Sequence, residues 1–272
     1  MFFVDVALLV LIVVALYWFG TKRKHRQRTI TEELFTLPGA SLNVTKSSLF
    51  HFPKAPKGSE PYFLCFDTET CSTQPGDLLF YEESVVPTRV VVLSYALLDT
   101  KGRLIESHCN LLHTDETITP EAEQMHGIST VMMQRSGHTP TSVYTPFARS
   151  LEKAKVVVAH NLFFHKVMMD ADCLHYGLPS LPWSGKAALC TMEKGEYFME
   201  RLNLNPTHKA PRLTELYGVL YFRKPDLLLS YTNKGEADLK LLIAVLLYML
   251  DAHTLPQFRD YDLLNDLESV QP

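Results

Sequence analysis

The segment 62–70 (YFLCFDTET) constrains the fold of this chain more than any other. Its apolar part, ending at Asp67, has the length and composition of a short buried strand, and Glu69 follows two residues later. Because side chains alternate between the two faces of a strand, the two carboxylates project to the same face. Such a pair can grip divalent cations through hard oxygen ligands. The segment therefore predicts a sheet with an acidic pair at the end of one strand.

Composition indicates a folded protein with an unevenly distributed charge. The 272 residues leave room for one ordinary domain and some extra segments, and 46% are hydrophobic. The five cysteines have no CxxC spacing, which argues against a zinc ribbon and for a reducing compartment. Residues 1–28 hold five of the 26 basic and one of the 30 acidic side chains, so the remainder has a net charge of −8. An acidic body excludes a broad footprint on duplex nucleic acid but leaves a small metal-dependent pocket for a strand end.

The N-terminal segment 2–20 is apolar except for Asp5 and is followed by a basic cluster at 22–28. About 20 helical residues span roughly 30 Å, the thickness of a bilayer core. The alternatives are a buried core helix and an amphipathic surface helix, but this segment has no polar face. By the positive-inside rule, we expect a single-pass membrane protein whose N-terminus is outside or lumenal and whose domain lies on the cytoplasmic side.

These observations divide the chain into four parts. We expect a transmembrane anchor (1–21), a basic juxtamembrane segment and linker (22–60), a folded domain (61–255) and a C-terminal tail (256–272).

Further strands are predicted at 88–98, 104–112 and 155–159, the first two joined by a hairpin turn at 99–102 (DTKG). Helical spacing of apolar residues predicts helices at 163–176, 213–219 and 236–252. Strands followed by alternating strands and helices indicate an α/β domain with a mixed sheet flanked by helices.

Four segments in order carry a resemblance to a known family. They are 66–70 (FDTET), 120–129 (PEAEQMHGIS), 157–164 (VVAHNLFF) and 210–217 (APRLTELY). Together they resemble the DnaQ-like (DEDD) family of 3′–5′ exonucleases, over about residues 62–249. The resemblance implies a ribonuclease H-like fold with a mixed five-stranded sheet, and cleavage of nucleic-acid 3′ ends by two-metal phosphodiester hydrolysis. Four acids and one base carry that chemistry in the family.

The resemblance assigns three acids to this chain, namely Asp67, Glu69 and Asp238 as ligands of Mg²⁺ or Mn²⁺. Where the second motif should supply an acid the chain has His165, and where the third should supply a histidine it has Asn233. The tyrosine variant of the family places its tyrosine at the position of Lys234. Contacts with the substrate are expected from residues beside these motifs: Thr68, Thr70, His126 and Asn161.

The two substitutions predict impaired or altered chemistry. An imidazole at His165 removes one negative charge and favours Zn, Ni or Co over Mg. The same histidine has an alternative interpretation, as a helix residue with satisfied hydrogen bonds, and the two stay open at this point. Asn233 cannot act as a general base, which typically removes a factor of ~10² to 10⁴. Asp170 points to another face of its helix and Asp172 lies about 10 Å further along the axis, so neither compensates, whereas Glu236 is nearer the third motif and is expected to contribute weakly.

Three functional hypotheses follow. The first is a membrane-anchored 3′–5′ exonuclease-like protein that acts on single-stranded DNA or RNA 3′ ends with impaired or altered activity. The second is an inactive pseudo-exonuclease that binds nucleic-acid ends or a protein partner, and the acidic body favours the latter. The third is a membrane scaffold in which the domain is an adaptor.

Overall fold

A computed structural model describes residues 52–73, 88–204, 209–226 and 234–269 of the chain. All of these described residues belong to one compact unit. The predicted anchor and most of the predicted linker lie outside the described residues. Within the described ranges no single helix is long and apolar enough to span a membrane. Two consecutive helical segments, Lys234–Thr254 and Pro256–Glu268, are long and apolar enough only when taken together, and the chain bends by 91° between them.

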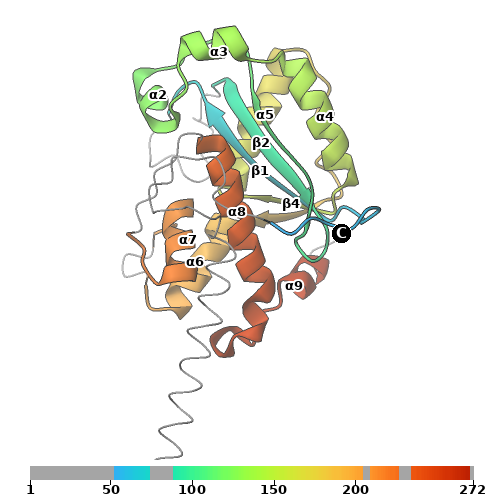
Figure 1. Cartoon of the computed structure of the whole chain (residues 1–272), viewed down its shortest axis with the longest axis vertical. Helices are drawn as coiled ribbons and strands as arrows, with labels where there is room; N and C mark the ends of the chain where they lie inside the picture. Colours follow the sequence, from blue (N-terminus) through green and yellow to red (C-terminus); the bar gives the residue numbers. More distant parts are fainter. Residues whose placement is uncertain (1–51, 74–87, 205–208, 227–233, 270–272) are drawn as a thin grey trace, which may run out of the picture. The chain divides into compact units, whose positions relative to one another are not determined.

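The centre of the domain is a mixed sheet with the strand order β3-β2-β1-β4-β5 (Figure 1). Strands β2 and β3 run antiparallel to their neighbours, whereas β4 and β5 continue the sheet in parallel from β1. The predicted mixed five-stranded sheet is thus confirmed, and its fifth strand, β5, has no counterpart among the strands that the sequence predicts. The strands are β1 (Phe63–Thr70), β2 (Val90–Leu98), β3 (Leu104–Leu111), β4 (Val156–Ala159) and β5 (Ala187–Cys190).

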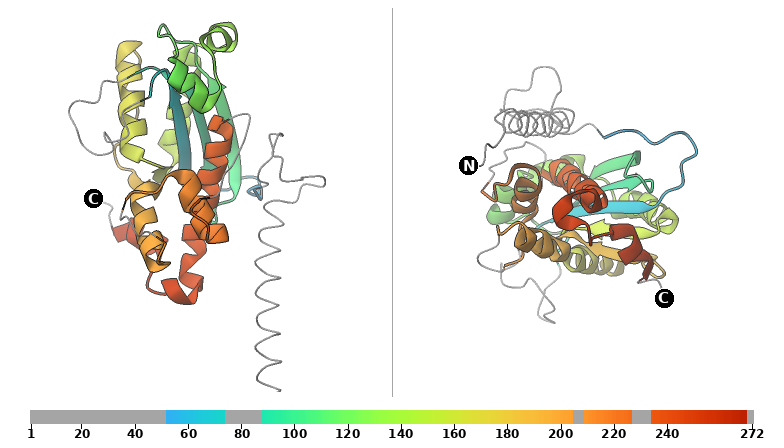
Figure 2. Two further views of the ribbon diagram at one scale, coloured as in Figure 1. Left: turned by 90° about the vertical axis from the view of Figure 1, so that its left-hand side faces the viewer. Right: turned by 90° about the horizontal axis from the view of Figure 1, so that it is seen from below.

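Helices flank this sheet, as expected for an α/β domain (Figures 1 and 2). The three predicted helices correspond to α5, α7 and α8; α2, α3, α4, α6 and α9 were not predicted. Their bounds are α2 (Pro120–His126), α3 (Thr130–Ser136), α4 (Pro140–Lys153), α5 (Leu162–His175), α6 (Thr191–Arg201), α7 (Leu213–Phe222), α8 (Lys234–Asp251) and α9 (Leu263–Ser269), with short 3-10 turns at Ala252–Thr254 and Pro256–Phe258.

Strand β1 is buried on both faces, and its alternating side chains serve two different purposes. Leu64 and Phe66 face the core that α4 and α5 form, where the ring of Phe66 lies 5.7 Å from that of Phe147 and 5.6 Å from that of Trp183. The opposite face is covered by α8, which packs on β1 and β2. Asp67 and Glu69 therefore lie between the sheet and α8.

The hairpin between β2 and β3 closes as the DTKG sequence predicts. The amide of Gly102 donates to the carbonyl of Asp99 at 3.0 Å, and Gly102 adopts φ +70°, a left-handed conformation that glycine accepts without strain. The Asp99 carboxylate accepts the amides of Lys101 and Arg103, each at 2.9 Å. This capped turn sets the register between β2 and β3, in which Ser94 lies opposite Cys109.

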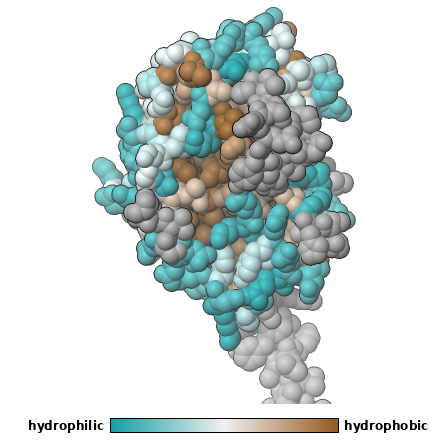
Figure 3. Space-filling model, turned by 180° about the vertical axis from the view of Figure 1, so that it is seen from behind, coloured by the Kyte–Doolittle hydropathy of each residue, from teal (hydrophilic) through white to brown (hydrophobic). Residues whose placement is uncertain are grey.

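The C-terminal part of the described chain packs on the domain. Phe258, Leu263 and Leu267 are buried, and α9 contacts β5 and α8. Apolar surface remains on α5, where Phe163 is 43% and Leu174 84% exposed. Figure 3 shows apolar side chains gathered on the face opposite that of Figure 1.

Candidate active site

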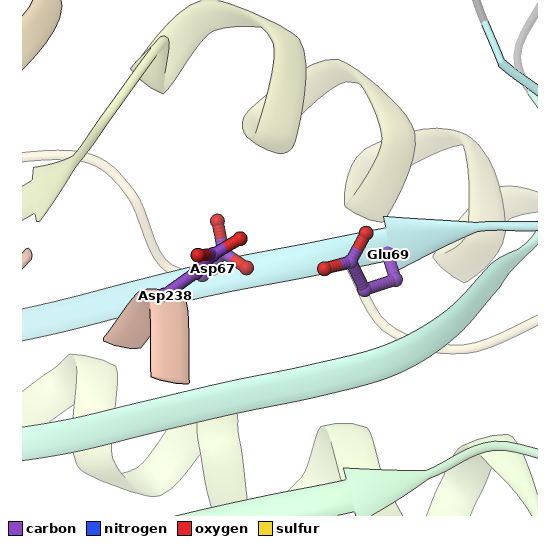
Figure 4. A group of neighbouring side chains, drawn as sticks. All are labelled: Asp67, Glu69 and Asp238. Carbon is purple, nitrogen blue, oxygen red and sulfur yellow. The ribbon is translucent and has the colours of Figure 1, made fainter. Parts of the chain in front are cut away.

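Three carboxylates converge between β1 and α8 (Figure 4). Asp67 and Glu69 come from β1 and Asp238 from the first turns of α8, and one oxygen of each lies within 4.8 Å of the others. All three residues are buried. We call Asp67, Glu69 and Asp238 the acidic cluster. The two acids at the strand end and the acid that the third motif assigns are therefore brought together from positions far apart in the sequence.

The close approach of α8 to the sheet depends on Gly235. A Cβ atom at this position would lie 2.8 Å from Val92 Cγ1 and 3.1 Å from Ser94 Oγ, both on β2. Any larger side chain would push the start of α8 away from the sheet. The neighbouring residues of the helix, Lys234 and Asp238, are thereby held over the end of β1.

The ammonium of Lys234 lies inside the acidic cluster. Its Nζ donates to Glu69 Oε1 at 2.7 Å and lies 2.9 Å from Asp238 Oδ2. The side chain of Lys234 is 26% exposed, whereas that of Glu69 is 6% and that of Asp238 is 11% exposed. Because these ion pairs are largely shielded from water, they are stronger than surface pairs of the same geometry.

The proximity of these charges shifts their proton affinities. Burial raises the pKa of Asp67 well above its usual value, and the nearby carboxylates of Asp238 and Glu69 add to the effect. Burial also raises the pKa of Glu69, although Lys234 opposes this shift. Burial opposes the charge of Lys234, but the surrounding carboxylates outweigh it and raise the pKa of the ammonium. Lys234 is therefore a permanent cation at neutral pH.

His165 lies beside the acidic cluster but turns its lone pair away from it. The Thr68 amide donates to His165 Nδ1 at 3.2 Å, and the Thr68 hydroxyl lies 2.8 Å from the same nitrogen. Nε2 lies 2.9 Å from the carbonyl of His160, which can only accept, so Nε2 carries the proton. Burial lowers the pKa of His165 to about 4, so the ring is neutral at neutral pH.

The same Nε2 lies 3.5 Å from Asp67 Oδ1, and because the ring is neutral this contact is not an ion pair. Of the two interpretations that the sequence left open, these contacts favour the helix histidine with satisfied hydrogen bonds. In this arrangement His165 offers no lone pair to a metal ion, so the shift towards Zn, Ni or Co that we expected from an imidazole ligand has no basis here.

The residues present fit one metal ion better than two. The acidic cluster offers enough oxygen ligands for one divalent cation. The Lys234 ammonium, however, already binds two of the three carboxylates, and the position of the fourth acid carries the N–H of His165. The pair of metal ions that the family resemblance implies therefore does not fit the arrangement described.

The remaining residues assigned to substrate contacts lie around the end of β1. His126 Nδ1 accepts the Ile128 amide at 3.1 Å, and its Nε2 lies 3.3 Å from the carbonyl of Thr70. The hydroxyl of Thr70 donates to the carbonyl of Ser72 at 2.8 Å. His126 thus joins α2 to the end of β1, and both of its nitrogens have partners within the protein. Burial lowers its pKa.

Asn161 occupies the N-cap of α5, in a left-handed conformation with φ 67° and ψ 59°. Its side chain makes no capping hydrogen bond. The preceding residue, His160, is tied to α6 and to the segment before α7, because its Nδ1 lies 3.0 Å from the Thr191 hydroxyl and its Nε2 2.8 Å from the carbonyl of Pro211. This junction between β4 and α5 determines where His165 lies.

The three acids that the sequence offers as replacements for the missing fourth carboxylate form ion pairs with residues outside the acidic cluster. Asp170 pairs with Lys166 at 2.6 Å and accepts from Trp183 Nε1 at 2.7 Å. Asp172 is fully buried and pairs with Arg89 at 3.0 Å. Glu236 pairs with Lys240 at 2.5 Å along α8. The other replaced position, Asn233, lies outside the described residues.

The residue whose role sequence reasoning missed is Lys234. One signal was present, since a lysine four residues from an acid on a helix forms an i, i+4 pair. Its second partner, Glu69, is 165 residues away in the chain. No spacing rule connects residues at that separation, so the bridge between β1 and α8 is visible only in the folded structure.

Comparisons with known proteins identify the fold. No family model and no curated protein matches the sequence. Among solved structures, exonuclease I in its apo form matches with a TM-score of 0.54 and 14% identity, over 74% of this chain and 44% of its own. The zinc-bound E. coli exonuclease I complex with single-stranded DNA matches with a TM-score of 0.56 and 15% identity, over 74% and 43%.

A product-bound structure of exonuclease I matches similarly, with a TM-score of 0.55 and 15% identity over 74% of this chain and 46% of its own. This chain therefore spans less than half the length of these solved structures. Identities this low establish the fold alone. The described residues of this chain therefore share the α/β fold of exonuclease I.

Proposed function

We propose that this chain engages the 3′ end of a single-stranded nucleic acid over the acidic cluster, and that phosphodiester hydrolysis there is slow. One observation carries this proposal: acids from the first and third motifs meet on an exonuclease fold, whereas the second-motif position presents the N–H of His165. The solved neighbours include a complex of exonuclease I with single-stranded DNA and a product-bound form. These complexes support the class of ligand proposed for this chain.

Slow hydrolysis follows from the chemistry of the residues. The attacking water must lose a proton, and Asn233 cannot accept one near neutral pH. The ring of His165 is neutral, but the lone pair on its Nδ1 already accepts a hydrogen bond from Thr68. His165 therefore does not replace the missing base. Loss of a positioned base alone costs a factor of ~10² to 10⁴.

The experiment uses the full chain in excess over 5′-labelled single-stranded DNA and RNA, with Mg²⁺ or Mn²⁺ present. Binding should be weaker to a matched oligonucleotide whose 3′ hydroxyl is blocked by a phosphate. Cleavage should proceed from the 3′ end at least ~10²-fold more slowly than in the double variant His165→Asp/Asn233→His. An Asp67→Asn variant checks for contaminating nuclease, because it should abolish any true cleavage. A chain that neither prefers a free 3′ end nor cuts would refute the proposal.

A second candidate is a module that binds 3′ ends without any cleavage, and the position of Lys234 favours it. An ammonium bound to Glu69 and Asp238 occupies oxygens that hydrolysis in this family requires. The same assay separates the two candidates: 3′-end binding with no product in either metal ion selects the binding module. Measurable wild-type cleavage abolished by Asp67→Asn selects the slow nuclease.

We further propose that residues 1–21 anchor the chain in a membrane with the domain on the cytoplasmic side, on the grounds of the apolar run and the basic cluster after it. Alkaline carbonate extraction of membranes from expressing cells should leave the full chain in the pellet, whereas a chain lacking residues 1–21 should be soluble. Release of the full chain by carbonate would exclude the anchor.

A further inference from the structure

Lys234, at the start of α8, places a positive charge inside the acidic cluster. Its Nζ lies 2.7 Å from Glu69 Oε1 and 2.9 Å from Asp238 Oδ2, distances typical of charge-assisted hydrogen bonds. The oxygens of the acidic cluster lie within 4.8 Å of one another, so a cation placed among them contacts more than one. The ammonium therefore uses ligand atoms that a divalent ion would need for its own coordination.

The charge balance of the cluster differs from that of a two-metal site. The family pattern supplies four carboxylates, whereas this chain supplies three together with one ammonium. The neutral ring of His165 adds no charge. The local net charge is thus two units less negative than in the family pattern, which weakens the attraction for any divalent cation.

The lysine is also tethered, which favours it over ions from solution. Lys234 lies on the same helix as Asp238, one turn earlier, and bridges to β1. Binding of a tethered group is intramolecular and corresponds to an effective concentration in the millimolar range or above. Its side chain is 26% exposed, so it retains a route to solvent.

We propose that Lys234 is a tethered cation that competes with divalent metal ions for the acidic cluster, and that removing its charge lets the cluster bind one metal ion more tightly. This proposal rests on the site proposed above. It is tested without nucleic acid, so that either proposal can fail alone.

The experiment titrates the full chain with Mn²⁺ at neutral pH and measures free Mn²⁺ by electron paramagnetic resonance. Lys234→Ala should bind one Mn²⁺ at least about tenfold more tightly than the wild type, because a nearby positive charge has been removed. Lys234→Arg keeps the charge and should behave like the wild type. Adding Asp67→Asn to Lys234→Ala should abolish the gained binding, which places the ion at the acidic cluster.

Lys240→Ala is the matched control. Lys240 lies on the same helix and pairs with the glutamate four residues earlier, Glu236, at 2.5 Å, outside the acidic cluster. This variant should not gain Mn²⁺ binding, so a gain there would attribute the effect to net charge and overturn the proposal.

Two further outcomes would overturn the proposal. One is a wild type that binds Mn²⁺ as tightly as Lys234→Ala. The other is a Lys234→Ala chain that binds no Mn²⁺. Should Lys234→Ala unfold because three carboxylates lack a cation, recovery of folding by Mn²⁺ supports the proposal, and continued unfolding in Mn²⁺ counts against it.

Discussion

Replacing Gly235 by alanine tests how the sheet positions the acidic cluster. The added Cβ would meet Val92 Cγ1 at 2.8 Å and Ser94 Oγ at 3.1 Å, whereas favourable carbon contacts lie at about 3.5 to 4.0 Å. Val92 is β-branched and stiff, so the start of α8 must move by roughly 1 Å. Overpacking of this kind costs about 1–3 kcal/mol, and the better helix propensity of alanine offsets up to about 1 kcal/mol of it.

We therefore expect Gly235→Ala to lower the free energy of unfolding by about 1–2 kcal/mol, measured by urea denaturation. The matched control is a double-mutant cycle with Val92→Ala, which removes the methyl group that the new Cβ would meet. The double variant should be less destabilised than the sum of the single variants by at least about 0.5 kcal/mol. Additive effects, or a Gly235→Ala chain more stable than the wild type, would refute the argument that this glycine permits close packing of α8 on β2.

Two further predictions concern buried polar groups. Burial lowers the pKa of His165 and His160 to about 4, below the usual value of about 6.5. These neutral rings therefore contribute fully to stability above pH ~6.5 and lose that contribution as the pH falls towards about 4. The variant His165→Gln should flatten the dependence of the unfolding free energy on pH across this window, in urea titrations at a series of pH values; an unchanged slope would contradict the shift. Asp172 accepts from the Tyr144 hydroxyl at 3.0 Å and pairs with Arg89 at 3.0 Å, so Asp172→Asn should destabilise the chain by about 3–5 kcal/mol in the same assay. A loss below about 1 kcal/mol would show that this pair is not a structural anchor.

Much of the fold was predictable because it depends on local patterns. Short apolar runs and β-branched residues located β1 to β4, and helical spacing located α5, α7 and α8. The fifth strand is Ala187–Cys190, only four residues long and without a periodic pattern. Helices α2 and α3 have seven residues each, too few for helical spacing to distinguish them from loops. Short elements owe their structure to packing, which local sequence does not encode.

The sequence by itself determined which residues lie on each of the two faces of β1. Alternation places Asp67 and Glu69 on one face and Phe66 on the other, and no tertiary information is needed for that result. Motif order then indicated Asp238 as their partner.

Only the tertiary structure decided which groups surround these acids. Hydrogen bonds from Thr68 and to His160 determine the tautomer of His165, and the approach of α8 to the sheet places the Lys234 ammonium among the carboxylates. The physical reason is range: side-chain alternation acts between neighbours in the chain, whereas electrostatic interactions depend on distances in space that only folding sets.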